Sequence, residues 1–536
     1  MRSVRAAAIC AVYFMSVMNI AFWRYVWRHI ELSDARSYVF ALSLPLAFFL
    51  AFFAAFSLIL WPWAGKPILG LLLVLSAAAN YFMVNLNVHI DSEMIRNLFE
   101  TNPGEAAEMI TLSGALWVAG LGLAPALALW KTKIVYGSPW REAARRTAGI
   151  LLALALFAGI GALLYKDYSS SARNNKVIGK LLNPANYVSS FISYVNKIRR
   201  ANQEFAVIDD DPNHVPYEDP YYTVLILMIG ETARAKNFSL NGYERETNPK
   251  LARQDIVNFP NVSASGTATA FSLPCMFSHL PRSKFNIDDS YQSENLLDVM
   301  AKAGYDVLWL DNDGGSKGVA QRVPYVDLMR DGKPPHRNGD TCFDEVLLDG
   351  LEEKLAGIRQ DTVIVLHMMG SHGPSYYKRY PEAFRKFTPT CDSAEIHNFP
   401  TEEIVNTYDN TILYTDHVVS ETIDILKRFP KHEAGLIFVS DHGESLGENG
   451  LFLHGFPYAF APQEQIRVPM LLWMSETMKR EDHIDYEKLG KAAGGLELSH
   501  DNLFHSVLGL VEIDTELYDP SLDFFREFRT KSLPYQ

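Results

Sequence analysis

The chain has 536 residues, of which 48% are hydrophobic and 21% charged, and its formal net charge is −13 at pH 7. One hydrophobic core rarely organises so many residues, so two domains are the first expectation. The acidic balance, without a basic arm or an RNA-binding signature, argues against a polyanion-binding surface, and we expect no nucleic-acid partner.

Long apolar runs are confined to the first third of the chain. Five are long enough to cross a bilayer, which takes about 20 apolar residues, and they cover residues 6–27, 38–61, 67–88, 112–130 and 147–165. The first run lacks a convincing small-residue cleavage site and four more follow it. We therefore interpret it as a retained span rather than a signal peptide.

The charges of the connecting loops predict the orientation of these spans. Arg2 and Arg5 precede the first span and the loop between the fourth and fifth is basic, whereas the loop around 89–111 is acidic. By the positive-inside rule the N-terminus is cytoplasmic, and everything after the fifth span lies outside.

The region after the last span changes character twice. Residues 166–204 mix aromatic with basic side chains, which is typical of a segment lying along a membrane surface. The polar, proline-bearing stretch 209–220 predicts a linker. We therefore divide the chain into a five-helix transmembrane domain (1–165), interfacial helices with a linker (166–220) and an outer domain (221–536).

The outer domain alternates strand-like apolar runs with helical patterns such as Ser293–Ala303 and Glu402–Arg428. This alternation predicts an α/β domain with a mostly parallel sheet and helices on both faces. Ligands bind beyond the carboxyl ends of such strands. A polar cluster follows each of the four runs, which are Thr223–Ile229, Asp306–Leu310, Thr362–His367 and Gly435–Val439.

Asp441 and His442 directly follow the last of these runs and offer an oxygen and a nitrogen ligand suited to Zn²⁺. Alone, such a pair is at least as often a structural hydrogen-bonding pair. Glu231 holds the same place after the first run and could complete a three-ligand set, or it could be a carboxylate in the first turn of a helix.

The stretch 265–274 is small, hydroxylated and flexible, and it leads into a helical pattern. A threonine at a helix N-terminus can be a nucleophile when a metal lowers the pKa of its hydroxyl. Spacing does not separate Thr267, Thr269 and Ser272, and without a metal the stretch is only a capping turn.

Four further residues are site candidates. His372 and His454 could act as general acids or ligands of a second metal, Lys317 could balance phosphate charge, and Glu444 could orient a metal ligand. Each also has an ordinary interpretation, because both histidines precede a glycine in a turn and Lys317 could be a solvated loop residue.

Asn97, Thr101 and Glu105 in the acidic outer loop recur every four residues and would share one face of a helix. They are either an ordinary solvated face or a polar surface for a cationic headgroup, with Glu105 facing an ammonium group.

Together these stretches resemble the lipid A phosphoethanolamine transferases, a family that includes the mobile colistin-resistance enzymes. The resemblance covers the whole outer domain and reaches into residues 89–106 and 166–176. It rests on long, specific strings, among them GETARAKNFSLNGYERETNP (230–249), SGTATAFSLPCMFS (265–278), DNDGGSKG (311–318), HMMGSHGPSYYKRYP (367–381) and SDHGESLGENGLFLHG (440–455).

The resemblance implies an alkaline-phosphatase/sulfatase-like outer domain in the periplasm, anchored in the bacterial inner membrane. It implies one tightly bound Zn²⁺, with a second one in turnover left open. The implied ligands are Glu231, Thr269, Asp441 and His442, and Thr269 becomes modified. Around the substrate phosphate or a second zinc it places Lys317, His372, Glu444 and His454, and for phosphatidylethanolamine binding Asn97, Thr101 and Glu105.

The implied reaction moves phosphoethanolamine from phosphatidylethanolamine to lipid A or a related glycolipid, which would weaken the binding of polymyxin-like cationic peptides. We expect a monomer. The alternatives are transfer to core heptose or to periplasmic glucan, a glycerophosphate polymerase of the lipoteichoic-acid type, and a degenerate envelope sensor without activity.

The cysteines depart from the family pattern. Of the four, Cys10 lies in the first span, and the odd number outside leaves at least one thiol without an intramolecular partner. The resemblance implies several disulfides, but Cys275, Cys342 and Cys391 have all lost their partners. The partner positions hold Ser265, His336 and Phe399, and a further pair is replaced by Ser316 and Ala320. We therefore expect three free thiols in the outer domain.

Overall fold

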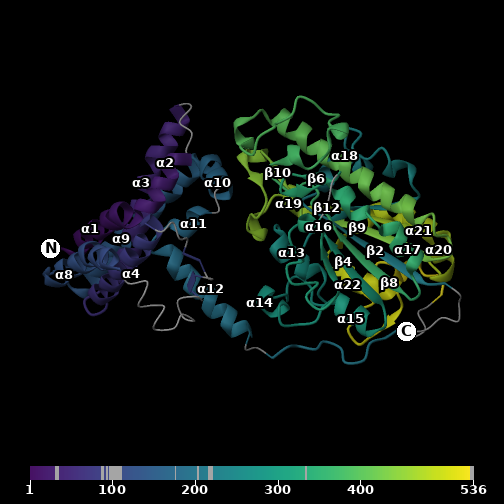
Figure 1. The fold of residues 1–536 in the computed structure, drawn as a ribbon, viewed down its shortest axis with the longest axis horizontal. Helices are drawn as coiled ribbons and strands as arrows, with labels where there is room; N and C mark the ends of the chain where they lie inside the picture. Colours follow the sequence, from purple (N-terminus) through teal and green to yellow (C-terminus); the bar gives the residue numbers. More distant parts are fainter. Residues whose placement is uncertain are drawn as a thin grey trace. The chain divides into compact units, whose positions relative to one another are not determined.

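A computed structural model describes residues 1–29, 35–85, 90–91, 94–95, 111–174, 177–201, 204–214, 221–331 and 335–531. The chain forms two compact units, Met1–Asn202 and Gln203–Gln536 (Figure 1).

The first unit contains five helical spans that are long and apolar enough to cross a membrane, which confirms the five predicted spans. They cover Ser3–Arg28 (α1, Ser3–Ser16; η1, Val17–Asn19; α2, Ile20–His29), Ala35–Ile59 (α3), Gly65–Asn85 (α4), Leu112–Lys131 (α7, Leu112–Val118; η2, Ala119–Leu123; α8, Ala124–Lys131) and Pro139–Leu163 (α9). In the apolar windows of the last two spans only 11% of the residues are buried. Their apolar side chains are thus left to face lipid.

Helix α9 begins eight residues before the predicted span, because its basic first turns form a polar start to the same helix. Glu142 and Arg146 make an i,i+4 ion pair of 2.9 Å in which both side chains are buried. Three shorter helices follow α9, namely α10 (Tyr165–Asn174), α11 (Val177–Leu181) and α12 (Ala185–Ala201).

The second unit is built on an eight-stranded sheet in the order β13-β3-β12-β9-β2-β8-β4-β5. The strands are Leu498–Ser499 (β13), Ile256–Ser263 (β3), Arg467–Met474 (β12), Glu433–Ser440 (β9), Thr223–Gly230 (β2), Thr362–His367 (β8), Asp306–Asp311 (β4) and Tyr325–Asp327 (β5). Only β12 runs antiparallel to its neighbours within this sheet. The predicted mostly parallel sheet is confirmed, and its four predicted strands lie side by side.

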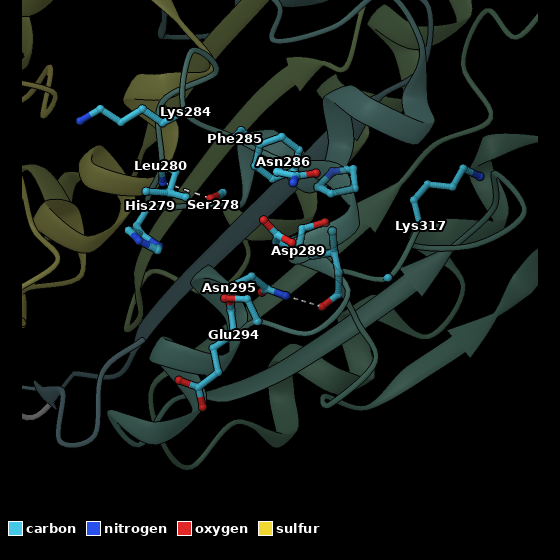
Figure 2. Close-up of a pocket in the computed structure, with 15 residues that line it drawn as sticks. Ser278, His279, Leu280, Lys284, Phe285, Asn286, Asp289, Glu294, Asn295 and Lys317 are labelled. Carbon is cyan, nitrogen blue, oxygen red and sulfur yellow. Dashed lines mark hydrogen bonds between the residues drawn. The ribbon is translucent and has the colours of Figure 1, made fainter. Parts of the chain in front are cut away.

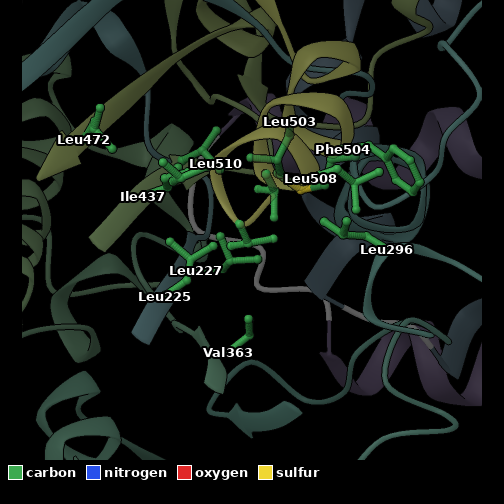
Figure 3. Close-up of a cluster of buried hydrophobic side chains, with 14 of the residues drawn as sticks. Leu225, Leu227, Leu296, Val363, Ile437, Leu472, Leu503, Phe504, Leu508 and Leu510 are labelled. Atoms are coloured by element: carbon green, nitrogen blue, oxygen red, sulfur yellow. The ribbon is translucent and has the colours of Figure 1, made fainter. Parts of the chain in front are cut away.

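Strand β2 shows why the sheet is covered on both faces. Leu225, Leu227 and Ile229 belong to one buried apolar cluster, and the alternate residues of the strand belong to another. The first cluster is covered by α13 (Thr269–Met276), α15 (Leu296–Lys302), α21 (Tyr486–Ala492) and α22 (Asp501–Leu510) (Figure 3). The second is covered by α17 (Leu351–Gly357) and α18 (Thr401–Leu426).

The segment before β2 also belongs to the second unit. Asn213–His214 (β1) pairs with Ile513–Asp514 (β14), and Ala206 bridges to Ser293. Asn213 and His214 of the predicted linker are therefore paired with the outer unit.

Candidate functional site

Four loops meet at one edge of the sheet because four neighbouring strands end there. Gly230 lies beside Ser440 in the pairing of β2 with β9, and His367 at the end of β8 lies beside Ile229 and Asp311. The polar clusters that follow the predicted strands are thereby brought together, as the sequence predicts.

Glu231, Asp441 and His442 are fully buried, and each offers a ligand atom within 4.8 Å of the others. Asp441 Oδ1 accepts the backbone N–H groups of Thr232 (3.0 Å) and His442 (2.7 Å), whereas Asp441 Oδ2 has no hydrogen-bond partner in the described structure. A buried carboxylate oxygen without a donor is costly unless a cation binds it.

The histidine of this set is oriented for metal binding. His442 Nδ1 lies 2.9 Å from the Gly443 carbonyl oxygen, so it carries the ring proton. Nε2 is thereby free to be a ligand, and it lies 3.4 Å from Asp441 Oδ2 and 3.7 Å from Glu231 Oε1. One buried carboxylate pair and one imidazole nitrogen form a donor set that fits Zn²⁺.

The backbone at Glu231 is tightly constrained. Gly370 has a φ of +49°, and a Cβ atom there would lie 2.6 Å from the Glu231 carbonyl oxygen, so only glycine fits. Thr232 has a φ of 61°, which is strained for a β-branched residue.

Thr269 is the hydroxyl residue whose oxygen faces the ligand atoms. It is the first residue of α13, it is 8% exposed, and its Oγ1 lies 2.9 Å from Glu231 Oε2 and 3.4 Å from His442 Nε2. The other two hydroxyls donate to backbone carbonyls: Thr267 to Phe456 and Ser272 to Asp441. Geometry thus distinguishes three residues that spacing leaves equivalent.

Two histidines border this group. The His454 ring lies 4.4 Å from the His442 ring and 6.2 Å from the His372 ring, measured between centroids, and His454 Nδ1 lies 3.3 Å from Glu444 Oε2. Burial lowers the pKa of His372 to about 4. Burial also acts to lower the pKa of His454, but Glu444 outweighs it and the pKa is raised.

Lys317 lies at the rim of the site with a φ of 50°, and its Nζ is 3.8 Å from Asp313 Oδ2. It also lines a pocket beside α13 (Figure 2), together with Pro274, His279, Lys284, Phe285 and Asp289. Asn97, Thr101 and Glu105 lie outside the described residues.

The structure adds three residues with buried side chains that the sequence reasoning did not single out. Asp313 and His367 form a second potential ligand group with Glu231, and Asp311 is hydrogen-bonded to His367. Despite the opposing effect of burial, the hydrogen bond and charge of His367 lower the pKa of Asp311 to about 2. Burial and the charge of Glu231 hold the pKa of Asp313 well above its usual range. The strings DNDGGSKG and HMMGSHG contain these residues, but only strand register shows that they meet.

The four cysteines are free thiols and all are buried. Burial raises the pKa of Cys275 and that of Cys391 to about 11.

Two family models match the chain. The model for sulfatases covers residues 223–513, and the model for the phosphoethanolamine transferases EptA/EptB covers residues 48–198. Phosphoethanolamine transferase EptA of Escherichia coli K12 is 42% identical over 98% of this chain and 96% of that protein. Phosphatidylethanolamine transferase Mcr-1 of E. coli is 32% identical over 97% and 96%.

Solved structures agree with the sequence matches. The integral membrane lipooligosaccharide phosphoethanolamine transferase A of Neisseria meningitidis superposes with a TM-score of 0.66 at 37% identity, over 99% of both chains. Its soluble domain superposes with a TM-score of 0.60 at 43% identity and covers 62% of this chain. The chain therefore belongs to the phosphoethanolamine transferase family, and its outer unit has the sulfatase-like fold.

Proposed function

We propose that this chain transfers phosphoethanolamine from phosphatidylethanolamine to lipid A, through a phosphoethanolamine group carried on Thr269. The observation that supports this most strongly is the position of the Thr269 hydroxyl, 2.9 Å from Glu231 and 3.4 Å from His442. The Neisseria relative is a lipooligosaccharide phosphoethanolamine transferase, which favours a lipid A-type acceptor.

The residues that would hold Zn²⁺ are Glu231, Asp441 and His442, with Thr269 as the fourth ligand. The unpartnered Oδ2 of Asp441 and the unprotonated Nε2 of His442 support this assignment. A bound zinc ion would lower the pKa of the Thr269 hydroxyl and neutralise negative charge at the phosphate.

The chain's own residues then carry two displacements. The Thr269 hydroxyl passes its proton to Glu231 Oε2, to which it donates, and attacks phosphorus. The P–O bond to diacylglycerol breaks as the Thr269 Oγ1–P bond forms. His372 or His454 gives the departing diacylglycerol oxygen its proton, and the raised pKa of His454 favours His454 over His372, whose pKa is lowered. An oxygen of the acceptor phosphate next attacks phosphorus and gives its proton to the same histidine, and the Thr269 oxygen leaves and recovers its proton from Glu231.

Other residues position the substrates. Lys317 would balance the charge of the transferred phosphate, and the contact of His454 with Glu444 would hold the His454 ring in place. Asn97, Thr101 and Glu105 would bind the ethanolamine headgroup of the donor, with Glu105 facing the ammonium group.

The membrane unit confines the enzyme to the surface that carries both lipid substrates and raises their effective concentration. We propose that residues 1–165 span the inner membrane with a cytoplasmic N-terminus, that the helices within 166–220 lie along its outer surface, and that the catalytic domain is periplasmic and monomeric. Adding a cation-bearing group to lipid A lowers the negative surface charge, which would reduce polymyxin binding.

Mass spectrometry of lipid A from Gram-negative cells that express the chain and lack other such transferases tests this proposal. We expect lipid A species heavier by one or two phosphoethanolamine groups, and unmodified lipid A in cells expressing Thr269→Ala. If only core heptose or periplasmic glucan is modified, that molecule and not lipid A is the acceptor. No modified envelope component would contradict the proposed transfer.

A further inference from the structure

Glu231 belongs to two groups of ligand atoms. Besides its group with Asp441 and His442, it forms another with Asp313 and His367, whose ligand atoms also lie within 4.8 Å of one another. We propose that this second group binds a second divalent cation, bridged to the zinc site by Glu231. The proposal rests on the zinc site proposed above, and it uses residues other than those that the family resemblance places around a second zinc.

His367 is built as a metal ligand rather than as an ordinary core histidine. Its Nδ1 lies 2.7 Å from Asp311 Oδ1, and Asp311 is itself held by Trp309 Nε1 (3.1 Å) and the Gly315 N–H group (2.7 Å). A histidine that binds a metal usually donates its other ring N–H to a carboxylate in this way.

The second ring nitrogen of His367 has nothing else to bind. His367 is fully buried, and its Nε2 has no hydrogen-bond partner in the described part of the chain. The nearest ionisable oxygen is Asp313 Oδ2 at 3.8 Å, which is beyond hydrogen-bond distance. A cation between these two atoms would satisfy both.

Asp313 shows the same deficit. Its side chain is 3% exposed, and its Oδ1 is buried with no hydrogen-bond partner among the described residues. Lys317 Nζ is also 3.8 Å from Oδ2 and is therefore a neighbouring charge rather than a hydrogen-bond donor to Asp313. A buried carboxylate in this state is costly unless it is neutralised.

The balance of charge points the same way. The edge of the sheet brings together four buried carboxylates, those of Glu231, Asp311, Asp313 and Asp441. One zinc ion would offset only part of this negative charge, and an anionic phosphodiester must still enter. A second divalent cation would offset more of it and leave Lys317 free to approach the phosphate oxygens.

The donor set defines the class of cation. One imidazole nitrogen with two carboxylate oxygens suits Zn²⁺ or Mn²⁺ rather than Ca²⁺ or Mg²⁺, which prefer oxygen ligands alone. In the cell we expect Zn²⁺, and Mn²⁺ is a useful spectroscopic substitute.

The test is the metal content of the tag-free full-length chain in detergent, stripped by a chelator, reloaded with Zn²⁺ and freed of excess metal. We expect two ions per chain in the wild type and one in both Asp313→Asn and His367→Gln. Asp441→Asn changes a ligand of the proposed zinc site alone, and this variant should also retain one ion. Asp327→Asn, at the end of β5, is the matched control and should retain two.

A second readout uses the same proteins loaded with Mn²⁺. Because one carboxylate would bridge both ions, the electron paramagnetic resonance spectrum of the wild type should show an exchange-coupled pair, and that of Asp313→Asn an isolated ion. Asparagine resembles a protonated Asp313 in shape but lacks the carboxylate charge that a cation needs. Two ions bound to Asp313→Asn would therefore overturn the proposal. If the wild type binds one ion and Asp441→Asn binds none, the second site is overturned and the proposed zinc site stands. If the wild type binds no metal, both proposed sites are overturned.

Discussion

Thr269 Oγ1 donates a 2.9 Å hydrogen bond to Oε2 of the fully buried Glu231. A hydroxyl at the start of a helix is thus paired directly with a proton acceptor that also belongs to two groups of metal-binding atoms. This pairing gives Thr269 a role that neither Thr267 nor Ser272 shares, because those hydroxyls donate to backbone carbonyls.

Thr269→Ala should reduce phosphoethanolamine transfer by at least about 10³-fold, because no covalent intermediate can form. Thr269→Ser keeps a hydroxyl and should retain measurable transfer. The assay follows a labelled phosphatidylethanolamine donor with purified lipid A. Thr267→Ala is the matched control for the loop, and a loss there as large as in Thr269→Ala would argue against a specific role for Thr269.

Glu105→Ala in the full-length chain should lower kcat/KM for phosphatidylethanolamine by about 10- to 100-fold, the effect of one lost charged contact. Hydrolysis of a small soluble phosphodiester by the same protein should be unchanged, because that substrate does not need the headgroup contact. Unchanged lipid turnover would remove Glu105 from the donor site.

The cysteines should all be free. Alkylation of the unreduced, denatured full-length chain should add four labels, and two labels would reveal one disulfide. In the folded protein, Cys275 and Cys391 should react roughly 10²-fold more slowly than an exposed cysteine, since burial raises the pKa of each to about 11. Reductant should leave the thermal midpoint unchanged.

Asp482 should make the stability of the outer unit pH-dependent. Burial, with the charges of Glu433 and Glu512, holds the pKa of Asp482 well above its usual range, and its Oδ2 has no hydrogen-bond partner among the described residues. In the unfolded chain the Asp482 carboxyl has an ordinary pKa of about 4, so above that pH it has lost the proton that it keeps in the folded state. This contribution to stability therefore falls as pH rises.

Asp482→Asn removes that dependence. Its thermal midpoint relative to wild type should increase between pH 5 and pH 8, by roughly 2–4 °C for each kcal/mol gained. Scanning calorimetry of both full-length proteins across this range measures the difference. A difference that stays constant with pH would show that Asp482 does not titrate as its burial implies.

The parts of the fold that follow from short-range pattern were predictable. The five apolar helices and the four central strands are continuous apolar runs, and their alternation with helices fixes the parallel arrangement. Strands β3 and β12 were not predicted, because Pro260 and Pro469 interrupt their apolar patterns. The structure accommodates both prolines at a register shift between Val468 and Met470.

The site was predictable only in part for a similar reason. Asp441 and His442 are adjacent in sequence and show their chemistry directly. Asp313 and His367 follow different strands, and only the pairing of Asp311 with His367 brings their side chains together. The choice of Thr269 over Thr267 came from family resemblance, and the structure supplies its physical basis in hydrogen bonding.

The central claim is that Thr269 carries the phosphoethanolamine group between donor and acceptor. The most direct measurement is peptide mass spectrometry of the purified full-length chain after incubation with phosphatidylethanolamine and no acceptor. We predict one phosphoethanolamine group on Thr269, which disappears when lipid A is added. An unmodified Thr269 under conditions in which transfer proceeds, or a group carried on another residue, would contradict the mechanism.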